Sequence, residues 1–257
     1  MTLSPDYAVG AQSDLPRPTD DYSRIEMRSY ADFGAVEWQV GLRRESGAAP
    51  ALIEDPCSAD FTAAFPSRRP TTLHWSKGSH SETSDFAPQE RVLEHGVAVA
   101  LASFGGRSSD GAMPYFNLND GKGGIILAIG WTGDWTASFA SGEPGQVHIS
   151  AGLDRTHFML PPDEELRLPS ILLMPYAGDW TDGQNKFRRL TLRHFTPANH
   201  SPMELMPVAA SVHGLVGFND TTEANLCELA AVVASAKLPI DTFWLDAGWN
   251  EAGFPLG

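Results

Sequence analysis

Two short apolar runs near the end of the chain are each followed by polar residues that are able to bind a ligand. The run IDTFWL (240–245) ends in Asp246-Ala247-Gly248-Trp249, and the run MPVAASV (206–212) ends in His213-Gly214. An unpaired carboxylate is costly inside an apolar strand, so Asp246 is expected at the carboxyl end of the strand, where water or a polar ligand pairs with it. The alternative is an acid that begins a tight turn, with Gly248 supplying the backbone geometry. For His213, the alternative to ligand binding is a structural hydrogen bond within the fold. For Trp249, the alternative is packing in the hydrophobic core.

The elements around these residues form a strand, a helix and a second strand. Both apolar runs lack alternation, which is typical of strands buried on both faces of a parallel sheet. Between them, Thr222 or Asp220 is placed to cap a helix over 223–237. Its apolar residues keep helical spacing, at Leu226, Leu229, Ala230 and Val233. This βα repeat with its next strand predicts the first unit of a (β/α)8 TIM-type barrel, in which sites lie at the strands' carboxyl ends.

The earlier part of the chain predicts antiparallel β-structure. From Tyr22 to Arg44, apolar and polar residues alternate with a period of two, which indicates half-buried strands. Further strands are expected at 71–76, 89–93, 97–104, 125–131, 135–140, 146–152, 156–160 and 170–176. Many short strands separated by Gly, Pro, Asn and Asp favour a β-sandwich.

One helix, over residues 182–194, is expected to connect this sandwich to the barrel unit. Phe187, Leu190 and His194 form its expected apolar side, with three arginines in solvent. The predicted domains are therefore a β-sandwich over 1–180, a linker helix and connector over 181–205, and an incomplete (β/α)8 barrel over 206–257. The chain is expected to be an N-terminal part of a larger protein.

No metal or cofactor is predicted. Lys122-Gly123-Gly124 lacks the spacing of a phosphate loop and precedes a strand, which favours a hairpin turn. Asn117, Asn119 and Asp120 are oxygen donors, but they do not form an EF-hand pattern. The two cysteines, Cys57 and Cys227, are far apart, and Cys227 is expected on the buried side of its helix.

Composition excludes several classes of partner. The 257 residues include 32 acidic and 18 basic ones, a formal charge of −14, and the basic residues do not cluster as nucleic-acid binding requires. No apolar run approaches the roughly 20 residues of a membrane helix. The N-terminus lacks the pattern of a signal peptide, so a cytoplasmic location is expected. The composition does not exclude a homo-oligomer.

Three separated segments together resemble the melibiase-like α-galactosidases of glycoside hydrolase family 36. They are GGRSSDGAMPYFNLNDGKGGIILAIGWTGDW (105–135), KFRRLTLRHFTP (186–197) and FWLDAGW (243–249). The resemblance implies a retaining hydrolase of terminal α-galactosides that uses two aspartates, one as nucleophile and one as acid and base. In the family these aspartates lie on later barrel strands, so they are expected downstream of Gly257. No residue of this chain is assigned to catalysis, and the chain alone is expected to be inactive.

The resemblance also assigns substrate-binding roles. Asp246 matches a position that binds sugar hydroxyls, where the family has Asp-Asp-Gly-Trp, and Trp249 matches the family's tryptophan. Ala247 replaces the second acid, which raises an α-N-acetylgalactosaminide as an alternative substrate to an α-galactoside. His213 stands where the family often has a tryptophan.

Besides a glycosidase that acts on galactosides or oligosaccharides, two other functions are considered. One is a sugar-binding sandwich module that uses exposed aromatic residues such as Trp75, Trp131, Trp135 and Trp180, although core packing is the better interpretation of Trp131 and Trp135. The other is a scaffold domain without a site. FWLDAGW favours the glycosidase, because a free-standing lectin-like module does not need it.

Overall fold

The computed structural model describes residues 10–12, 23–196, 208–211, 216–217, 219–245, 247–251 and 253. The chain divides into two compact units, Met1–Thr191 and Leu192–Gly257. The division falls after Thr191, within the segment 182–194 that the sequence predicts as a connecting helix. The domain bounds given above remain a prediction.

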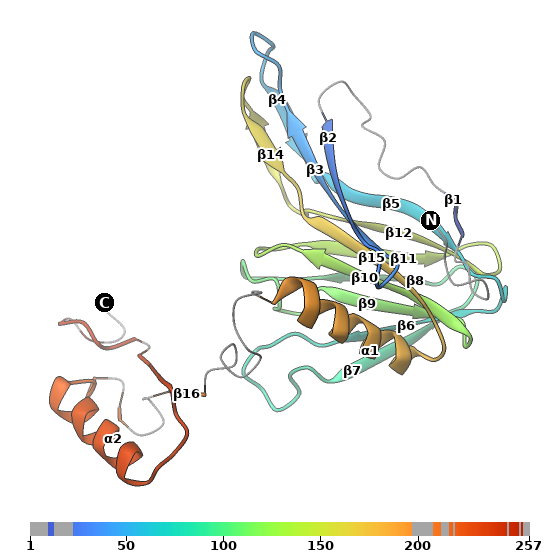
Figure 1. Cartoon of the computed structure of the whole chain (residues 1–257). Coiled ribbons are helices and arrows are strands. Elements are labelled where there is room, and N and C mark those ends of the chain that lie inside the picture. The colour runs from blue at the N-terminus through green and yellow to red at the C-terminus, as the bar shows by residue number, and fades with distance from the viewer. Residues whose placement is uncertain are drawn as a thin grey trace. The chain divides into compact units, whose positions relative to one another are not determined.

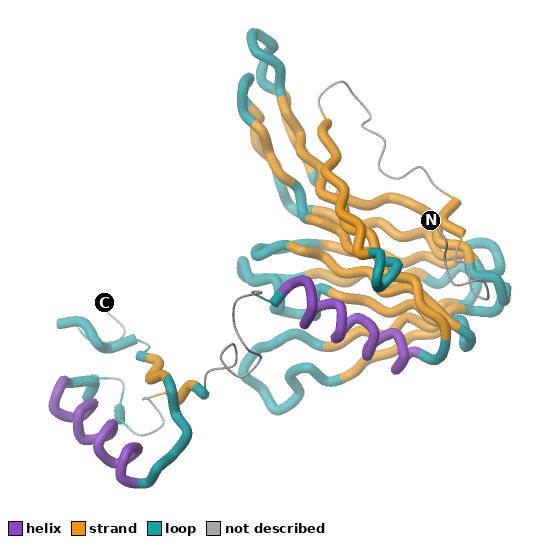
Figure 2. The backbone as a smooth tube through the Cα atoms, in the orientation of Figure 1, coloured by secondary structure: helices purple, strands orange, loops and turns teal. Residues whose placement is uncertain are grey.

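The first unit consists mainly of antiparallel strands (Figures 1 and 2). One sheet has the spatial order β1 (Gly10–Gln12), β5 (Cys57–Ala64), β12 (Gln146–Gly152), β11 (Thr136–Ser141) and β8 (Ala98–Ala102). The second has the order β14 (Glu165–Arg167), β3 (Ala35–Arg43), β15 (Ser170–Ala177), β10 (Gly123–Gly130), β9 (Tyr115–Asn119), β6 (Thr71–Ser76) and β7 (Pro88–Leu93), with β2 (Ser23–Tyr30) also paired to β3. A separate two-stranded ribbon joins β4 (Ala51–Glu54) to β13 (His157–Leu160). This arrangement confirms the predicted antiparallel β-sandwich.

The main core lies between the two sheets. It joins Phe116 of β9 to Phe139 of β11, whose ring centroids are 5.0 Å apart, and Phe116 to Trp135 at 5.5 Å. Trp38 of β3 packs edge-on to Phe61 of β5 and donates its indole N–H to the carbonyl of Ser58. Large aromatic side chains that alternate along strands of both sheets therefore account for the sandwich.

Strand β10 is buried on both faces, which explains its unbroken apolar sequence. Ile125 and Leu127 face the main core, whereas Ile126 belongs to a second cluster with Met174 and Leu190. The second cluster is covered by α1 (Trp180–Leu190), which lies against β9, β10 and β15 (Figure 1). The helix thus closes the outer face of the second sheet.

Helix α1 begins with a capping box. The Asp179 carboxylate accepts from the backbone N–H of Asp182, and the Asp182 carboxylate accepts from that of Asp179, both at 3.0 Å. The helix continues into a π-helical turn, Thr191–Phe195. The predicted helix is confirmed, with Phe187 and Leu190 on its packed side, but His194 is exposed.

The second unit contains β16 (Ala209–Ser211), α2 (Glu223–Ser235) and β17 (Thr242–Trp244). Thr222 caps α2 by accepting from the backbone N–H of Asn225 at 3.3 Å, and Val233 faces inward. The prediction for Cys227 was wrong, because this residue is exposed. The described residues contain one parallel strand pair, so a (β/α)8 barrel remains a prediction.

Several strands of the first unit were missed in the sequence. Strand β5 carries its inward face on Ala59, Phe61 and Ala63, a pattern too small in side-chain volume to stand out as hydrophobic alternation. Strand β9 places Asn117 and Asn119 in buried positions. Within the described residues, no helix is long and apolar enough to cross a membrane.

Candidate functional site

The two strands that precede the predicted site residues are parallel neighbours. Ala209 pairs with Thr242, Ala210 with Phe243 and Ser211 with Trp244. Helix α2 lies between the strands in sequence, which is the connection that parallel strands require. Both strands therefore end at the same edge of the sheet.

The amino ends of these strands are tied together by Asp241. Its carboxylate accepts from the backbone N–H of Val208 at 3.1 Å, and its own backbone N–H donates to the Val208 carbonyl at 3.0 Å. Asp241 therefore has a structural role at the edge opposite to the carboxyl ends.

Of the three predicted substrate-binding residues, Trp249 lies in the described part of the chain. Its side chain is 67% exposed, so it does not belong to a core of the described residues. Asp246 and His213 lie outside the described residues. Gly248 adopts a φ of +89°, a left-handed conformation that favours glycine and agrees with the predicted tight turn.

The loops that follow the two strands meet near Gly253 and Asn219. A Cβ atom at Gly253 would lie 2.8 Å from the side-chain oxygen of Asn219. In the same loop, the side-chain oxygen of Asn250 is buried and has no hydrogen-bond partner among the described residues. Sequence reasoning missed Asn250, because a single Asn after a tryptophan carries no recognisable pattern.

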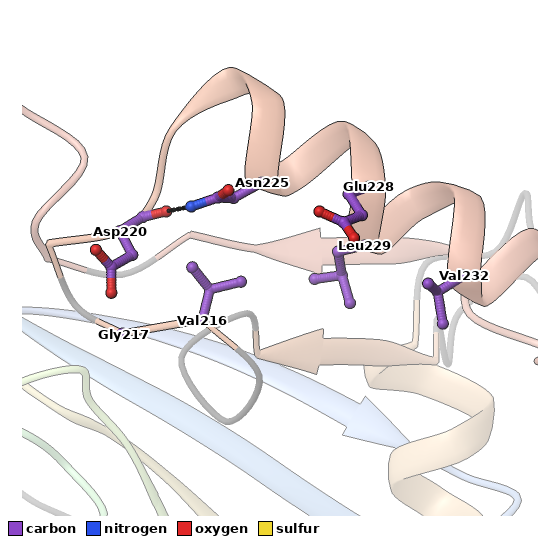
Figure 3. Close-up of a pocket in the computed structure, with 7 residues that line it drawn as sticks. All are labelled: Val216, Gly217, Asp220, Asn225, Glu228, Leu229 and Val232. Atoms are coloured by element: carbon purple, nitrogen blue, oxygen red, sulfur yellow. Dashed lines mark hydrogen bonds between the residues drawn. The ribbon is translucent and has the colours of Figure 1, made fainter.

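A pocket of about 470 Å³ lies between α2 and the loop around Val216 (Figure 3). Its described lining is Val216, Gly217, Asp220, Asn225, Glu228, Leu229 and Val232. The Asn225 side chain donates to the Asp220 carbonyl at 2.7 Å, which ties the loop to the first turn of the helix. Trp249 is not among these lining residues, so the pocket does not coincide with the described part of the predicted site.

The aromatic residues that suggested a sugar-binding sandwich do not gather on its surface. Trp135 is fully buried, and Trp75 and Trp131 are partly buried against the main core. Trp180 is 42% exposed and stacks on His74, with ring centroids 5.0 Å apart and an interplanar angle of 16°. Core packing is therefore confirmed for Trp131 and Trp135.

The oxygen donors Asn117 and Asn119 form a buried network with Tyr176. The Tyr176 hydroxyl donates to the Asn117 side-chain oxygen and accepts from the Asn119 amide at 2.9 Å. The Asn117 amide donates to the Trp180 carbonyl at 2.9 Å, at the start of α1. Burial raises the pKa of the Tyr176 hydroxyl. These bonds join β9 to β15 and to the first residue of α1, so Asn117 and Asn119 have a structural role.

Comparisons with known proteins identify the fold. No family model matches the chain, and no curated protein gives a significant match. The galactosidase domain of the α-galactosidase-sucrose kinase AgaSK matches with a TM-score of 0.65 and 19% identity, over 81% of this chain and 29% of that one. The GH36 α-galactosidase AgaB from Geobacillus stearothermophilus matches with a TM-score of 0.67 and 18% identity, over 88% and 31%.

A third solved structure contains a sugar. The A355E D548N variant of the GH36 α-galactosidase AgaA from Geobacillus stearothermophilus, in complex with raffinose, matches with a TM-score of 0.60 and 17% identity, over 88% of this chain and 33% of that one. The chain thus spans about a third of the length of these proteins. At this level of identity the likeness establishes the fold.

Proposed function

We propose, from the premise that this chain has the fold of part of a GH36 α-galactosidase, that it is the N-terminal part of a retaining glycoside hydrolase of terminal α-galactosides. The observation that carries the proposal is the fold match over 81–88% of the chain. The segment FWLDAGW supports it, because this segment begins within the second of two parallel strands and ends in an exposed tryptophan.

The proposed reaction is a double displacement. One aspartate attacks the anomeric carbon while a second protonates the leaving oxygen, and water then hydrolyses the glycosyl-enzyme with the second acting as base. Both aspartates are proposed to lie beyond Gly257, so the 257-residue chain is expected to form no covalent glycosyl-enzyme. Its own contribution is to the recognition of the sugar.

In this proposal Asp246 accepts hydrogen bonds from sugar hydroxyls, and Trp249 packs its ring against the sugar's C–H face. The Trp249 side chain is 67% exposed among the described residues, so one face of its ring is open to a ligand. His213 follows β16 by two residues, as Asp246 follows β17 by two. Raffinose is an α-galactoside, so the sugar bound by AgaA supports this substrate class.

The test is Asp246→Asn in the longer enzyme that the proposal implies. A hydrogen bond to a charged group contributes about 1.5–3 kcal/mol, so kcat/KM for an α-galactoside is expected to fall by roughly one to two orders of magnitude. The matched control is Asp241→Asn, at the opposite end of the same strand, which is expected to lower stability rather than kcat/KM. Full activity in Asp246→Asn would contradict the assigned role.

Substrate choice is tested with Ala247→Asp. This change restores the second acid and is expected to shift preference from α-N-acetylgalactosaminides toward plain α-galactosides. A panel of aryl α-galactosides, α-N-acetylgalactosaminides and α-glucosides measures the shift. An unchanged profile would show that residue 247 does not contribute to specificity.

A further inference from the structure

Two loops of the first unit are in direct contact around His80. The loop between β6 and β7 carries His80, and the loop between β8 and β9 carries Asp110 and Gly111. Gly78 donates its backbone N–H to the Gly111 carbonyl at 3.0 Å, and a Cβ atom at Gly78 would lie 2.8 Å from the Gly111 nitrogen. A change in the hydrogen bonds of one loop is therefore felt by the other.

The Nε2 atom of His80 has two neighbours that require opposite states of protonation. The Gly111 backbone N–H donates to Nε2 at 3.2 Å, and a ring nitrogen that accepts carries no proton. Oδ1 of the Asp110 carboxylate lies 2.8 Å from the same nitrogen, and a carboxylate oxygen only accepts, so this contact is attractive when Nε2 carries a proton. A ring nitrogen has one position in the ring plane, which holds either a proton or a lone pair. The two interactions therefore exclude each other.

Asp110 gains the most from a proton on His80. The residue is 6% exposed, and the Arg107 guanidinium donates to its Oδ2. Its Oδ1 is buried and has no hydrogen-bond donor among the described residues, because the nearby Nε2 accepts from Gly111. A buried charged oxygen without a donor is costly. Protonation of His80 supplies the missing donor.

The other charged groups of the two loops leave this choice to His80 and Asp110. The Asp85 carboxylate accepts from the backbone N–H groups of His80 and Ser81, at 3.0 and 2.8 Å, so it holds the backbone of the first loop. Arg107 is already paired with Asp110. The full set of Lys, Arg, Asp and Glu residues in the two loops is Lys77, Glu82, Asp85, Arg107 and Asp110.

Gly111 connects the histidine to an aromatic ring at the surface. A Cβ atom at Gly111 would lie 2.9 Å from two ring atoms of Phe104, and the φ of Gly111 is +82°, so the backbone packs closely against this ring. The Phe104 side chain is 51% exposed, and the Arg155 guanidinium lies 5.9 Å from its ring centroid. A movement of the Gly111 amide therefore reaches the surface through Phe104.

We propose that His80 is a proton-operated switch of the loop 104–111. The neutral ring accepts from the Gly111 N–H, whereas the imidazolium releases this N–H and donates to Oδ1 of Asp110. The proton is exchanged with solvent, since the His80 side chain is 48% exposed. Histidine is the residue that usually changes charge between about pH 5 and pH 8. The switch does not rest on the proposed function.

A pH titration of the 257-residue chain followed by NMR tests the proposal. Between about pH 8 and pH 5, the Gly111 amide proton is expected to move upfield as it loses its acceptor, with the same midpoint as the His80 ring. The Phe104 ring resonances are expected to follow with this midpoint. A Gly111 amide that stays constant while the His80 ring titrates would overturn the proposal, and a constant Phe104 ring would overturn the connection to the surface.

Two variants and a matched control identify the groups involved. His80→Gln is expected to abolish the pH dependence of the Gly111 amide, and its persistence there would overturn the proposal. Asp110→Asn is expected to move the midpoint of the Gly111 titration to lower pH by about one unit, because the imidazolium loses its carboxylate partner. An unchanged midpoint would overturn the role of Asp110. The control is His148→Gln, which removes an exposed histidine that lies 3.2 Å from an Asp60 oxygen, and it is expected to leave the Gly111 titration unchanged.

Discussion

Tyr176 of β15 is bonded through its hydroxyl to two asparagines of β9, Asn117 and Asn119. Its hydroxyl is the meeting point of the Asn117 and Asn119 side chains, all of which are buried. Removing one member of a buried network leaves its partners unsatisfied. The hydroxyl therefore stabilises a core that holds two asparagines.

Tyr176→Phe is expected to lower the free energy of unfolding of the first unit by about 1–3 kcal/mol, because it leaves buried amide groups without a hydrogen-bond partner but keeps the aromatic ring. Urea denaturation measures this change. Tyr115→Phe is the matched control, because the Tyr115 ring contacts Phe187 and its hydroxyl makes no hydrogen bond to the described part of the chain. Equal effects of the two substitutions would contradict the role of the network.

His74 makes the stability of the first unit depend on pH. Burial beneath Trp180 lowers the pKa of His74, and the Glu90 carboxylate, 3.4 Å from its Nδ1, partly opposes this. Since the folded-state pKa is below the unfolded value of about 6.5, the unfolded chain binds the proton more readily. Stability from this group is complete above pH 6.5 and decreases as the pH falls below it.

His74→Gln is therefore expected to flatten the loss of stability between about pH 7 and pH 5, measured by urea denaturation at several pH values. His157→Gln is the control, because His157 is an exposed partner of Glu54 on the ribbon. A slope that is unchanged in His74→Gln but reduced in His157→Gln would place the titrating group elsewhere.

At the scale of elements, α1 depends on its cap and on the face that it buries. The Asp179 carboxylate accepts from the backbone N–H of Asp182 in the first turn, and Leu190 is fully buried in the second cluster. Loss of an N-cap typically costs 0.5–2 kcal/mol. Because α1 covers β10, this loss is expected to reach the whole sandwich.

Asp179→Ala is expected to lower the melting temperature of the first unit, at a cost of about 1 kcal/mol. The matched control is Thr222→Ala, which removes the equivalent cap from α2 in the second unit. Near-UV circular dichroism of the buried tryptophans follows the first unit. If both variants lower its melting temperature equally, α1 is not integrated into the sandwich as its contacts indicate.

At the scale of the whole molecule, the two units differ in how much they bury. The first unit has two hydrophobic clusters, whereas Val233 is the one hydrophobic side chain below a tenth exposed among the described residues of the second. A single βαβ unit has sheet edges and a helix face without cover. The second unit is therefore expected to have the lower stability.

Limited proteolysis is expected to remove the second unit first and leave a resistant fragment that includes α1. The sequence places the cut near Pro197–Pro207, which lies outside the described residues. Mass spectrometry of the fragments locates the cleavage site. A second unit as resistant as the sandwich would contradict the difference in burial.

Local pattern was sufficient for much of the secondary structure. Strands β6 and β12 have the predicted bounds, because alternation of apolar and polar residues is a property of neighbouring positions. The apolar spacing of α1 and the Thr222 cap of α2 are local in the same sense. The hairpin between β9 and β10 also follows from a local glycine-rich turn.

The tertiary structure decided what depends on residues distant in sequence. Strand β9 was missed because Asn117 and Asn119 are buried only with Tyr176, 59 and 57 positions away. Trp135 and Trp180 have similar local surroundings in the sequence, yet one is fully buried in the core and the other is 42% exposed. The contact of His80 with Gly111, 31 positions away, is likewise invisible in the sequence, because it is set by packing between distant segments rather than by local pattern.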